Sequence, residues 1–367
     1  MAVDKPIGFV PEQEEMAENI LDIQVQDNVE KANVEMMEDG SAIIGEQENT
    51  LQTSFDMNLA EVLDDNTLGQ ISSELRQSFE DDKASRKEWE DTYKKGLDLL
   101  GFKYQERTMP FAGASSVTHP MLSEAITQFQ AQAYKELLPP GGPVNTQILG
   151  GITRQKEEQA QRVKDYMNYQ ITYEMEEYDP DMDSLLFYLP LSGSAFKKVY
   201  YDEGLQRAVS KFVPSDDLYV PYQTTDFPSC ERVTHVVRRT KNEVRKLQVA
   251  GLYRDVDLEK WTDETGLQEQ ESKISGVRKN YHDEDYQLLE MHVDLNIEGI
   301  DSEDGIKVPY IVTIDEGSTN VLSIYRNYEE QDPQKKKRQY FVHYKFLPGF
   351  GFYGFGLIHM LGGLSRT

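Results

Sequence analysis

The chain has 367 residues and a formal net charge of -27, with 65 acidic against 38 basic side chains. This length allows two or three domains with a sizeable buried core, and 21 Tyr and 15 Phe are too many for a wholly disordered acidic chain. The acidic balance excludes a protein that grips DNA along many phosphates, because such affinity comes mainly from Lys and Arg.

The first segment, residues 1–70, contains 17 acidic and 2 basic side chains and so carries more than half of the net charge. Its aliphatic residues are scattered between Glu, Asp, Gln and Asn without a helical or alternating period. Because so little apolar surface cannot offset the entropy of ordering, we predict a disordered acidic arm that ends near Gln70. The alternative is a peripheral arm whose short apolar clusters dock on a partner.

A helical part is predicted over residues 71–190. Helical spacing and stop signals predict four helices, from a cap at Ser72 or Ser73 to Gly101, from Pro120 to the stop at Pro139 and Pro140, from Thr153 to Tyr178, and from Pro180 to Leu189.

After Gly193 the apolar period shifts from helical toward two, which predicts strands. We expect a β-rich part over 191–253, a charged loop or insertion over 254–284, a β-hairpin region over 285–346, and a Gly-rich hinge with the start of an apolar helix over 347–367. The sequence DEGSTN at 315–320 is predicted to be a hairpin turn. The predicted fold class is therefore α+β, with a helical N-terminal part followed by mixed or antiparallel β structure.

Residues 349–354 read G-F-G-F-Y-G, a formal match to the dinucleotide-binding fingerprint. A Rossmann unit needs a second parallel strand and an acidic residue further on to hold the ribose, and the sequence continues only to Thr367. The glycines also alternate with bulky Phe and Tyr. This pattern favours an aromatic hinge over a nucleotide site.

Two groups of aspartates resemble functional carboxylate clusters. Asp179, Asp181 and Asp183 alternate as at the start of a calcium loop, but the sixth position lacks Gly and the twelfth lacks Glu, so an acidic helix start explains them better. Asp216 and Asp217 could serve as an acid and a base, but between two strands an Asx turn is the expected structure.

Histidine and cysteine patterns predict no catalytic centre. The single Cys230 excludes an internal disulfide and a cysteine-based zinc site. The histidines show no i, i+4 metal spacing, and those in predicted strands are expected to be core-edge or cross-strand residues; the six are His119, His235, His282, His292, His343 and His359. No nucleophile elbow or phosphate loop is present, so we assign no catalytic, cofactor-binding or metal-binding residues and expect no enzyme activity.

One strong basic run, formed by Lys335, Lys336, Lys337 and Arg338, follows an acidic stretch in a predicted loop. It is the candidate contact with DNA or with an acidic partner protein. The alternative is a solvated loop whose charges compensate one another.

Four stretches stand in a fixed order: R-T-M-P-F-A-G-A-S-S-V-T-H-P-M-L-S-E-A-I-T-Q-F-Q-A-Q-A from Arg107, L-S-G-S-A-F-K-K-V-Y-Y-D from Leu191, F-V-P-S-D-D-L-Y-V-P-Y from Phe212 with C-E-R-V-T-H-V after it, and H-Y-K-F-L-P-G-F-G-F-Y-G-F-G-L-I-H-M-L-G-G-L from His343. In order and spacing this series resembles the portal proteins of tailed bacteriophages, especially the short-tailed, podovirus-type phages. The resemblance covers about residues 72–367 and leaves the acidic arm outside. Phe111 stands where many relatives are expected to have Trp.

The resemblance implies a ring, typically a homododecamer, at one vertex of the capsid in the virion, assembled in the host cytoplasm. Double-stranded DNA would be pumped through its channel by the terminase large subunit and later ejected, with capsid and scaffolding proteins and a tail adaptor as further partners. No cofactor and no membrane are implied. The strands from Phe196 to Val237 would belong to a wing, and the 315–320 hairpin would lie nearer the motor. Because relatives are commonly longer, we expect the chain to lack the C-terminal half that would complete the stem and crown.

Two other classes of protein stay open on the sequence. One is a nucleotide-binding enzyme that uses the Gly-rich turn at 349–356. The other is an acidic adaptor or scaffold protein that binds a basic partner through residues 1–70.

Overall fold

A computed structural model describes residues 54–100, 111, 120–202, 204–260, 266–276, 285–297, 300 and 305–365, together with 34–36 and 42–44. The chain divides into two units, Met1–Leu51 and Gln52–Thr367. The described residues of the first unit are two short strands, β1 (Val34–Met36) and β2 (Ala42–Ile44), which pair antiparallel. This pair lies within the segment predicted to be disordered.

The second unit is mixed α+β, as predicted. Its helices are α1 (Asp65–Ser85), α2 (Lys87–Leu97), α3 (Met121–Leu137), α4 (Arg154–Tyr169), α5 (Tyr178–Ser192), α6 (Lys241–Val249), α7 (Gly266–Ser275) and α8 (Leu357–Ser365). Its strands are β3 (Ser194–Asp202), β4 (Arg207–Pro214), β5 (Leu218–Tyr219), β6 (Arg232–Thr240), β7 (Asp285–Leu295), β8 (Val308–Asp315), β9 (Val321–Arg326) and β10 (Phe341–Lys345). Short helical turns lie at Leu59–Glu61, Asp98–Leu100, Gln170–Glu174 and Ser215–Asp217.

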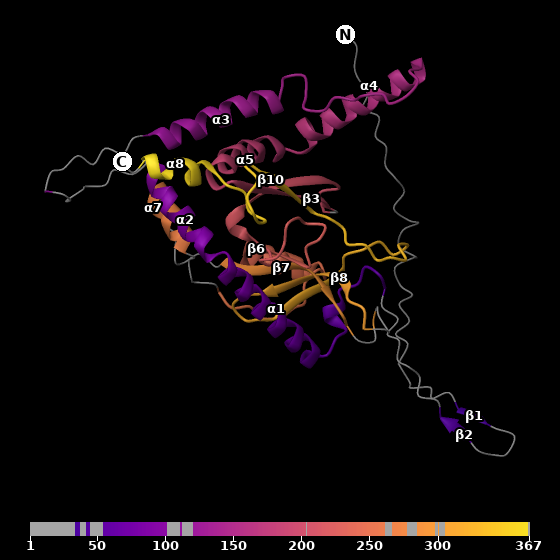
Figure 1. The fold of residues 1–367 in the computed structure, drawn as a ribbon. Helices are drawn as coiled ribbons and strands as arrows, with labels where there is room; N and C mark the ends of the chain where they lie inside the picture. Colours follow the sequence, from indigo (N-terminus) through magenta and orange to yellow (C-terminus); the bar gives the residue numbers. More distant parts are fainter. Residues whose placement is uncertain are drawn as a thin grey trace, which may run out of the picture. The chain divides into compact units, whose positions relative to one another are not determined.

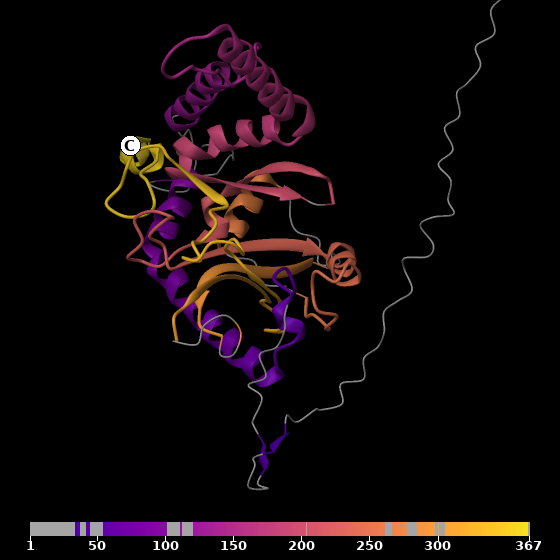
Figure 2. The same ribbon diagram turned by 90° about the vertical axis from the view of Figure 1, so that its right-hand side faces the viewer.

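The strands of the second unit form two antiparallel sheets (Figure 1). One has the order β10-β3-β4 and the other the order β5-β6-β7-β8-β9. The turn at 315–320 joins β8 to β9, which confirms the predicted hairpin. Within this unit the layers run from α3 and α5 through the three-stranded sheet and the five-stranded sheet to α1 (Figure 2).

Helix α1 covers the outer face of the five-stranded sheet. Leu75 and Phe79 of this helix are buried in one cluster with Leu289, Met291 and Val293 of β7. The three β7 residues share a face because side chains two positions apart in a strand point the same way. Each such buried side chain contributes about 1.5–3 kcal/mol of transfer free energy.

An aromatic layer fills the space between the two sheets. Phe196 of β3, Phe227 and Phe352 belong to one buried cluster, in which the Phe196 and Phe352 rings stack at 5.8 Å between centroids. The edge of Phe227 meets the Phe352 ring at 5.2 Å. Offset and edge-to-face contacts of this kind add to the free energy of area burial, so the layer holds the sheets together.

The folded unit begins before the predicted limit at Gln70. Leu59 and Leu68 are buried, and the side chain of Asn58 both donates to Leu322 O at 3.1 Å and accepts from Ile324 N at 2.9 Å. Asn58 thus pairs with the edge strand β9, although it lies 264 residues before Leu322 in the chain. A local apolar count missed this segment because its partners are so distant in sequence.

The single helix predicted from Ser72 to Gly101 is two helices. Asp64, and not Ser72 or Ser73, caps α1 by accepting from Thr67 N at 3.1 Å. The helix is interrupted at Arg86, which lies between α1 and α2. Gly101 lies outside the described residues.

Two further features differ from the sequence-based division. The segment 254–284, predicted to be a charged loop or insertion, contains α7. Its charged residues show no apolar periodicity from which a helix could be predicted. Strand pairing also crosses the predicted boundaries, because β6 pairs with β7 and β10 pairs with β3. The parts predicted over 191–253 and 285–346 therefore share both sheets.

Candidate functional site

The predicted basic contact lies in the loop between β9 and β10. Lys337 turns inward, where its Nζ donates to Cys230 O at 2.8 Å and lies 3.9 Å from Asp294 Oδ1. Lys335 Nζ lies 5.6 Å from the centre of the Tyr328 ring. These two lysines stabilise the loop.

Lys336 and Arg338 are the exposed members of the basic run. Their backbone amides are fixed, since Lys336 N donates to Asp332 Oδ2 at 2.9 Å and Arg338 N to Asn327 O at 3.0 Å. A contact with DNA or with an acidic partner stays a prediction for these two side chains.

The Gly-rich turn packs against the junction of α5 and β3. A Cβ atom on Gly354 would lie 2.4 Å from Gly193 O, and one on Gly356 would lie 2.3 Å from Leu191 O. These glycines are needed for close backbone approach. The packing explains them without a bound phosphate, and the burial of Phe352 fits an aromatic hinge.

Asp179, Asp181 and Asp183 lie at the start of α5, and each accepts a different hydrogen bond. Tyr134 Oη donates to Asp179 Oδ1 at 2.7 Å, and Gln130 Nε2 donates to Asp183 Oδ1 at 2.7 Å. Asp181 Oδ2 accepts from the backbone N of Phe212 on the edge strand β4 at 2.6 Å. The acidic helix start is confirmed, and among the described residues no group of three or more His, Cys, Asp or Glu could hold a metal ion.

Asp216 and Asp217 form part of a 3-10 turn, so the predicted Asx turn is wrong. Asp217 accepts from both terminal nitrogens of Arg238, at 2.7 and 3.3 Å. Asp216 points into the protein, where its Oδ1 atom is buried without a hydrogen-bond partner among the described residues.

Two strand histidines lie beside an ion pair between the sheets. Lys198 Nζ on β3 donates to both Glu290 oxygens on β7 at 2.6 Å, and His292 Nε2 lies 2.8 Å from Glu290 Oε1. Burial opposes ionisation, but Lys198 and His292 hold the pKa of Glu290 well below its usual range. Burial lowers the pKa of His235 to about 3. His235 and His292 are neutral core residues near pH 7, and the cluster links the sheets.

Lys197 is a buried cation that sequence reasoning missed. Its Nζ lies 4.0 Å from the centre of the Tyr178 ring and has no hydrogen-bond partner among the described residues. Burial lowers the pKa of Lys197 to about 8. Two adjacent lysines inside an otherwise apolar strand were the available signal, because alternation must send one of them to each face.

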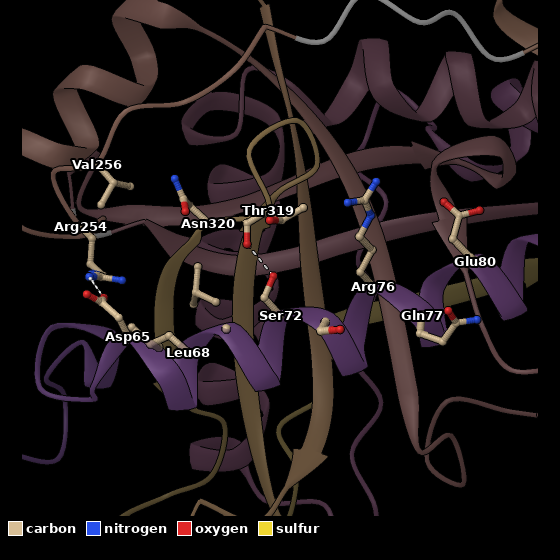
Figure 3. A pocket seen from close by; sticks show the side chains of 13 residues that line it. Asp65, Leu68, Ser72, Arg76, Gln77, Glu80, Arg254, Val256, Thr319 and Asn320 are labelled. Atoms are coloured by element: carbon tan, nitrogen blue, oxygen red, sulfur yellow. Dashed lines mark hydrogen bonds and ion pairs between the residues drawn. The ribbon is translucent and has the colours of Figure 1, made fainter.

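A groove of about 670 Å³ runs between α1 and the β8–β9 turn (Figure 3). Arg254 and Asp65 form an ion pair of 3.1 Å at one end, and Ser72 Oγ donates to Thr319 O at 2.5 Å across it. No His or Cys is among the lining residues. Because the Ser72 hydroxyl is directed at a carbonyl and has no adjacent base, this lining does not provide a nucleophile–base pair.

Helix α4 presents several exposed apolar side chains. None of its residues is buried, and Tyr166 is 58% exposed. We define the α4 surface as Leu149, Ile152, Val163, Tyr166, Met167, Tyr169 and Tyr173, all of which are exposed large hydrophobic residues. Val163, Tyr166, Met167 and Tyr173 lie on one side of the helix by their three- and four-residue spacing.

The opposite side of α4 is anchored. Val144 N donates to Asn168 Oδ1 at 2.9 Å, Asn168 Nδ2 donates back to Val144 O at 3.1 Å, and Thr146 Oγ1 donates to Ala160 O at 3.1 Å. The helix is thus positioned by its polar side, while its apolar side is exposed among the residues that the structure describes. The sequence predicted this helix but could not show that its apolar stripe stays exposed.

No protein-family model matches the chain, and a search of curated proteins finds no match. In the part of the chain that the structure describes, no helix combines the length and apolar character needed to span a membrane. The α4 surface and the exposed part of the basic loop are the candidate functional features.

Proposed function

We propose that this chain is the subunit of a bacteriophage portal, a ring that conducts double-stranded DNA into the capsid and later out of it. The observation that carries the proposal is the α4 surface, because a contact with a neighbouring subunit would bury it. Several exposed large apolar side chains on and beside one helix are typical of protein interfaces. The ordered series of portal-like stretches names the class of ring.

The composition of the α4 surface supports a contact between subunits. Tyr166, Tyr169 and Tyr173 present aromatic area with few rotatable bonds, and tyrosine and methionine are enriched at interface cores. Tyr169 and Tyr173 already stack at 5.7 Å between ring centroids. Their side chains are therefore partly ordered before the subunits meet, and binding loses less side-chain entropy. A pairing of the α4 surface with a different face of the next copy would be heterologous, and such a contact closes into a ring when the rotation between neighbouring copies divides a full turn evenly.

The charge distribution supports transport of DNA without tight binding. Among the basic side chains, Lys198, Arg232 and Lys337 are bound to carboxylates or carbonyls of the protomer itself. These three cations are therefore not available to trap a sliding polyanion through counterion release. The terminase motor, the scaffolding and capsid proteins and the tail adaptor are the partners that this function requires.

The test is to express the chain in its full reading frame and to measure its assembly by light scattering and electron microscopy. We expect rings of about a dozen subunits. A persistent monomer or dimer would overturn the proposed function.

Variants then locate the contact. Replacing Tyr166 and Met167 by Ser removes two large side chains, which should weaken each contact by about 3 kcal/mol or more, roughly a hundredfold in dissociation constant. The matched control is Tyr222→Ser, because Tyr222 is 82% exposed and lies outside α4. Rings that survive the α4 double variant would show that the subunits meet elsewhere.

A further inference from the structure

The two sheets of the second unit end in the strands β4, β5, β9 and β10. An edge strand presents backbone N–H and C=O groups that have no partner within the sheet. On β9, Ile324 N donates to Asn58 Oδ1 at 2.9 Å. On β5, Leu218 O accepts from Tyr353 Oη at 2.9 Å. Side chains of the protein therefore occupy backbone groups at both edges of the five-stranded sheet.

The β4 edge of the three-stranded sheet is occupied by two carboxylates. Ser210 N donates to Glu177 Oε1 at 3.3 Å. Phe212 N donates to Asp181 Oδ2 at 2.6 Å. Because both amides are already bonded, another strand cannot use them.

The hydrogen bonds at the two ends of β10 show which of its residues face β3. Val199 N donates to Tyr340 O at 2.8 Å, and Phe346 N donates to Gly193 O at 3.0 Å. The two sides of an antiparallel strand alternate along the chain. The even-numbered residues from 340 to 346 therefore bond to β3, and the odd-numbered residues between them face away from it.

The outward backbone groups of β10 have no cover. They are the N–H and C=O groups of Phe341, His343 and Lys345, and they make no hydrogen bond within the part of the chain that the structure describes. The edge of β10 thus differs from the β4 edge of the same sheet.

A groove of about 450 Å³ lies along this open edge. Its other side is the segment 225–228. Lys345 Nζ donates to Thr225 O at 3.4 Å, and Gln339 Nε2 donates to Phe227 O at 3.4 Å. Because long side chains make these contacts, the segment lies beside β10 without pairing with its backbone.

The lining of the groove suits an extended segment with apolar residues at alternate positions. Phe227 and Phe341 are buried in the aromatic layer on one face of the sheet. Val342 points to the opposite face and is 45% exposed. A strand added beside β10 would place its side chains on these two faces in turn, next to apolar neighbours on each.

The charge around the edge is basic. Lys345 lines the groove, and the exposed Lys336 and Arg338 lie in the loop that leads into β10. Asp226 is the carboxylate among the lining residues, and its Oδ1 already accepts from Ser229 N at 3.0 Å. An acidic segment is therefore complementary to this edge, and a basic one is not.

We propose that the β10 edge is a strand-addition site for an extended acidic segment of a partner protein. The segment would bond to the outward backbone groups of Phe341, His343 and Lys345, while the cations around the edge select for acidic residues. The proposal does not depend on the portal function, because the edge and the groove lie within one protomer.

Residue-resolved hydrogen–deuterium exchange of the full chain tests the open edge. Without a ligand, the amides of Phe341, His343 and Lys345 should exchange faster than those of Val342 and Tyr344, which bond to β3. Slow exchange at all five amides would overturn the proposal, because it would show that the edge is already paired, for example with a second copy.

A synthetic peptide of about nine residues that alternates Val and Glu is the probe for the site. At saturation it should slow exchange at His343 and Lys345 and leave Val342 and Tyr344 unchanged. A central Pro in the peptide removes one N–H donor, which should weaken binding up to about tenfold in titration calorimetry. Binding that leaves exchange at His343 and Lys345 unchanged, or no binding at all, would overturn the proposal. Equal affinity for a peptide with Lys in place of Glu would overturn the acidic partner.

Variants at Val342 test the same edge without touching the core, because this side chain is exposed. Val342→Glu should weaken binding of the acidic peptide by up to about fivefold, since like charges on neighbouring strands repel. Val342→Lys should strengthen it by a similar factor, and Val342→Thr is the uncharged control. Equal affinities of the Glu and Lys variants would show that the peptide binds elsewhere and would overturn the proposal.

Discussion

Arg86 is the residue whose loss should most disturb the packing of α1 and α2 on the 3-10 turn at 215–217. Its side chain is only 4% exposed. The guanidinium donates to three backbone carbonyl oxygens, those of Ser215 at 2.7 Å, Asp216 at 2.7 Å and Leu218 at 2.8 Å. Its central carbon lies 3.5 Å from the centre of the Tyr219 ring.

We expect Arg86→Met to lower the free energy of unfolding by about 3–5 kcal/mol. The substitution keeps most of the apolar stem, so the loss comes from polar groups. It removes the guanidinium donor from the carbonyls of Ser215 and Asp216, at about 1–3 kcal/mol each before relaxation, while Leu218 O keeps the hydrogen bond from Tyr353 Oη at 2.9 Å. It also leaves Glu90 without its cation, since the ion pair with Arg86 measures 2.8 Å. Breaking a buried pair by removing one partner costs a similar total of about 3–5 kcal/mol, so the two routes agree.

The control is Arg154→Met on α4. Arg154 also pairs with a glutamate four residues later, at 3.0 Å, but its side chain is 91% exposed. An exposed helical pair of this type contributes about 0.3–0.5 kcal/mol. Urea unfolding of both variants at one protein concentration should therefore separate them by several kcal/mol. A change under about 1 kcal/mol for Arg86→Met would refute the reasoning, because it would mean that water replaces the lost donors.

Two further predictions concern the glycine turn and the buried histidines. Gly354→Ala should destabilise the protein by about 2 kcal/mol or more in thermal unfolding, because the new Cβ would lie 2.4 Å from Gly193 O. Gly351→Ala, where nothing lies within 4 Å of the new Cβ, should stay within about 0.5 kcal/mol of the native protein. For His235, whose pKa falls to about 3 on burial, only the unfolded chain takes up a proton as pH drops below about 6.5, so stability falls toward acid. His235→Phe should reduce this slope between about pH 6.5 and pH 5, where Glu290 is still ionised in both states; an unchanged urea-midpoint slope would contradict the assignment.

The sequence predicted the elements whose signals are local. Helix α3 follows its Pro120 start and the stop at Pro139, and the β8–β9 hairpin follows DEGSTN, because turn residues and apolar spacing act over a few positions. The pairing of β10 with β3 could not be predicted in this way. It joins residues almost 150 positions apart, and local patterns contain no information about such partners.

For the candidate surfaces too, the sequence showed the local pattern but not the tertiary contacts. The basic run at 335–338 was visible as composition, but its separation into inward Lys337 and outward Lys336 depends on tertiary contacts with Cys230 O and Asp294. The stripe on α4 was visible as a helical period, but exposure depends on what the rest of the chain leaves uncovered. The helix α7 gave no periodic signal, because its contact with α2 uses a few side chains only.

The net charge takes a different meaning once the second unit is seen to begin at Gln52. The first unit, Met1–Leu51, then holds 13 acidic and 2 basic side chains, and the second unit has a larger acidic surplus than a boundary at Gln70 implied. Within the second unit several cations face inward, among them Arg86, Lys197 and Lys337. Buried carboxylates, among them Asp82, Asp315 and Glu316, offset these cations, so the outer surface of the second unit keeps an acidic surplus. An acidic surface repels DNA phosphates over a Debye length of about 8 Å at physiological salt, as the proposed portal function requires of a wall past which DNA slides.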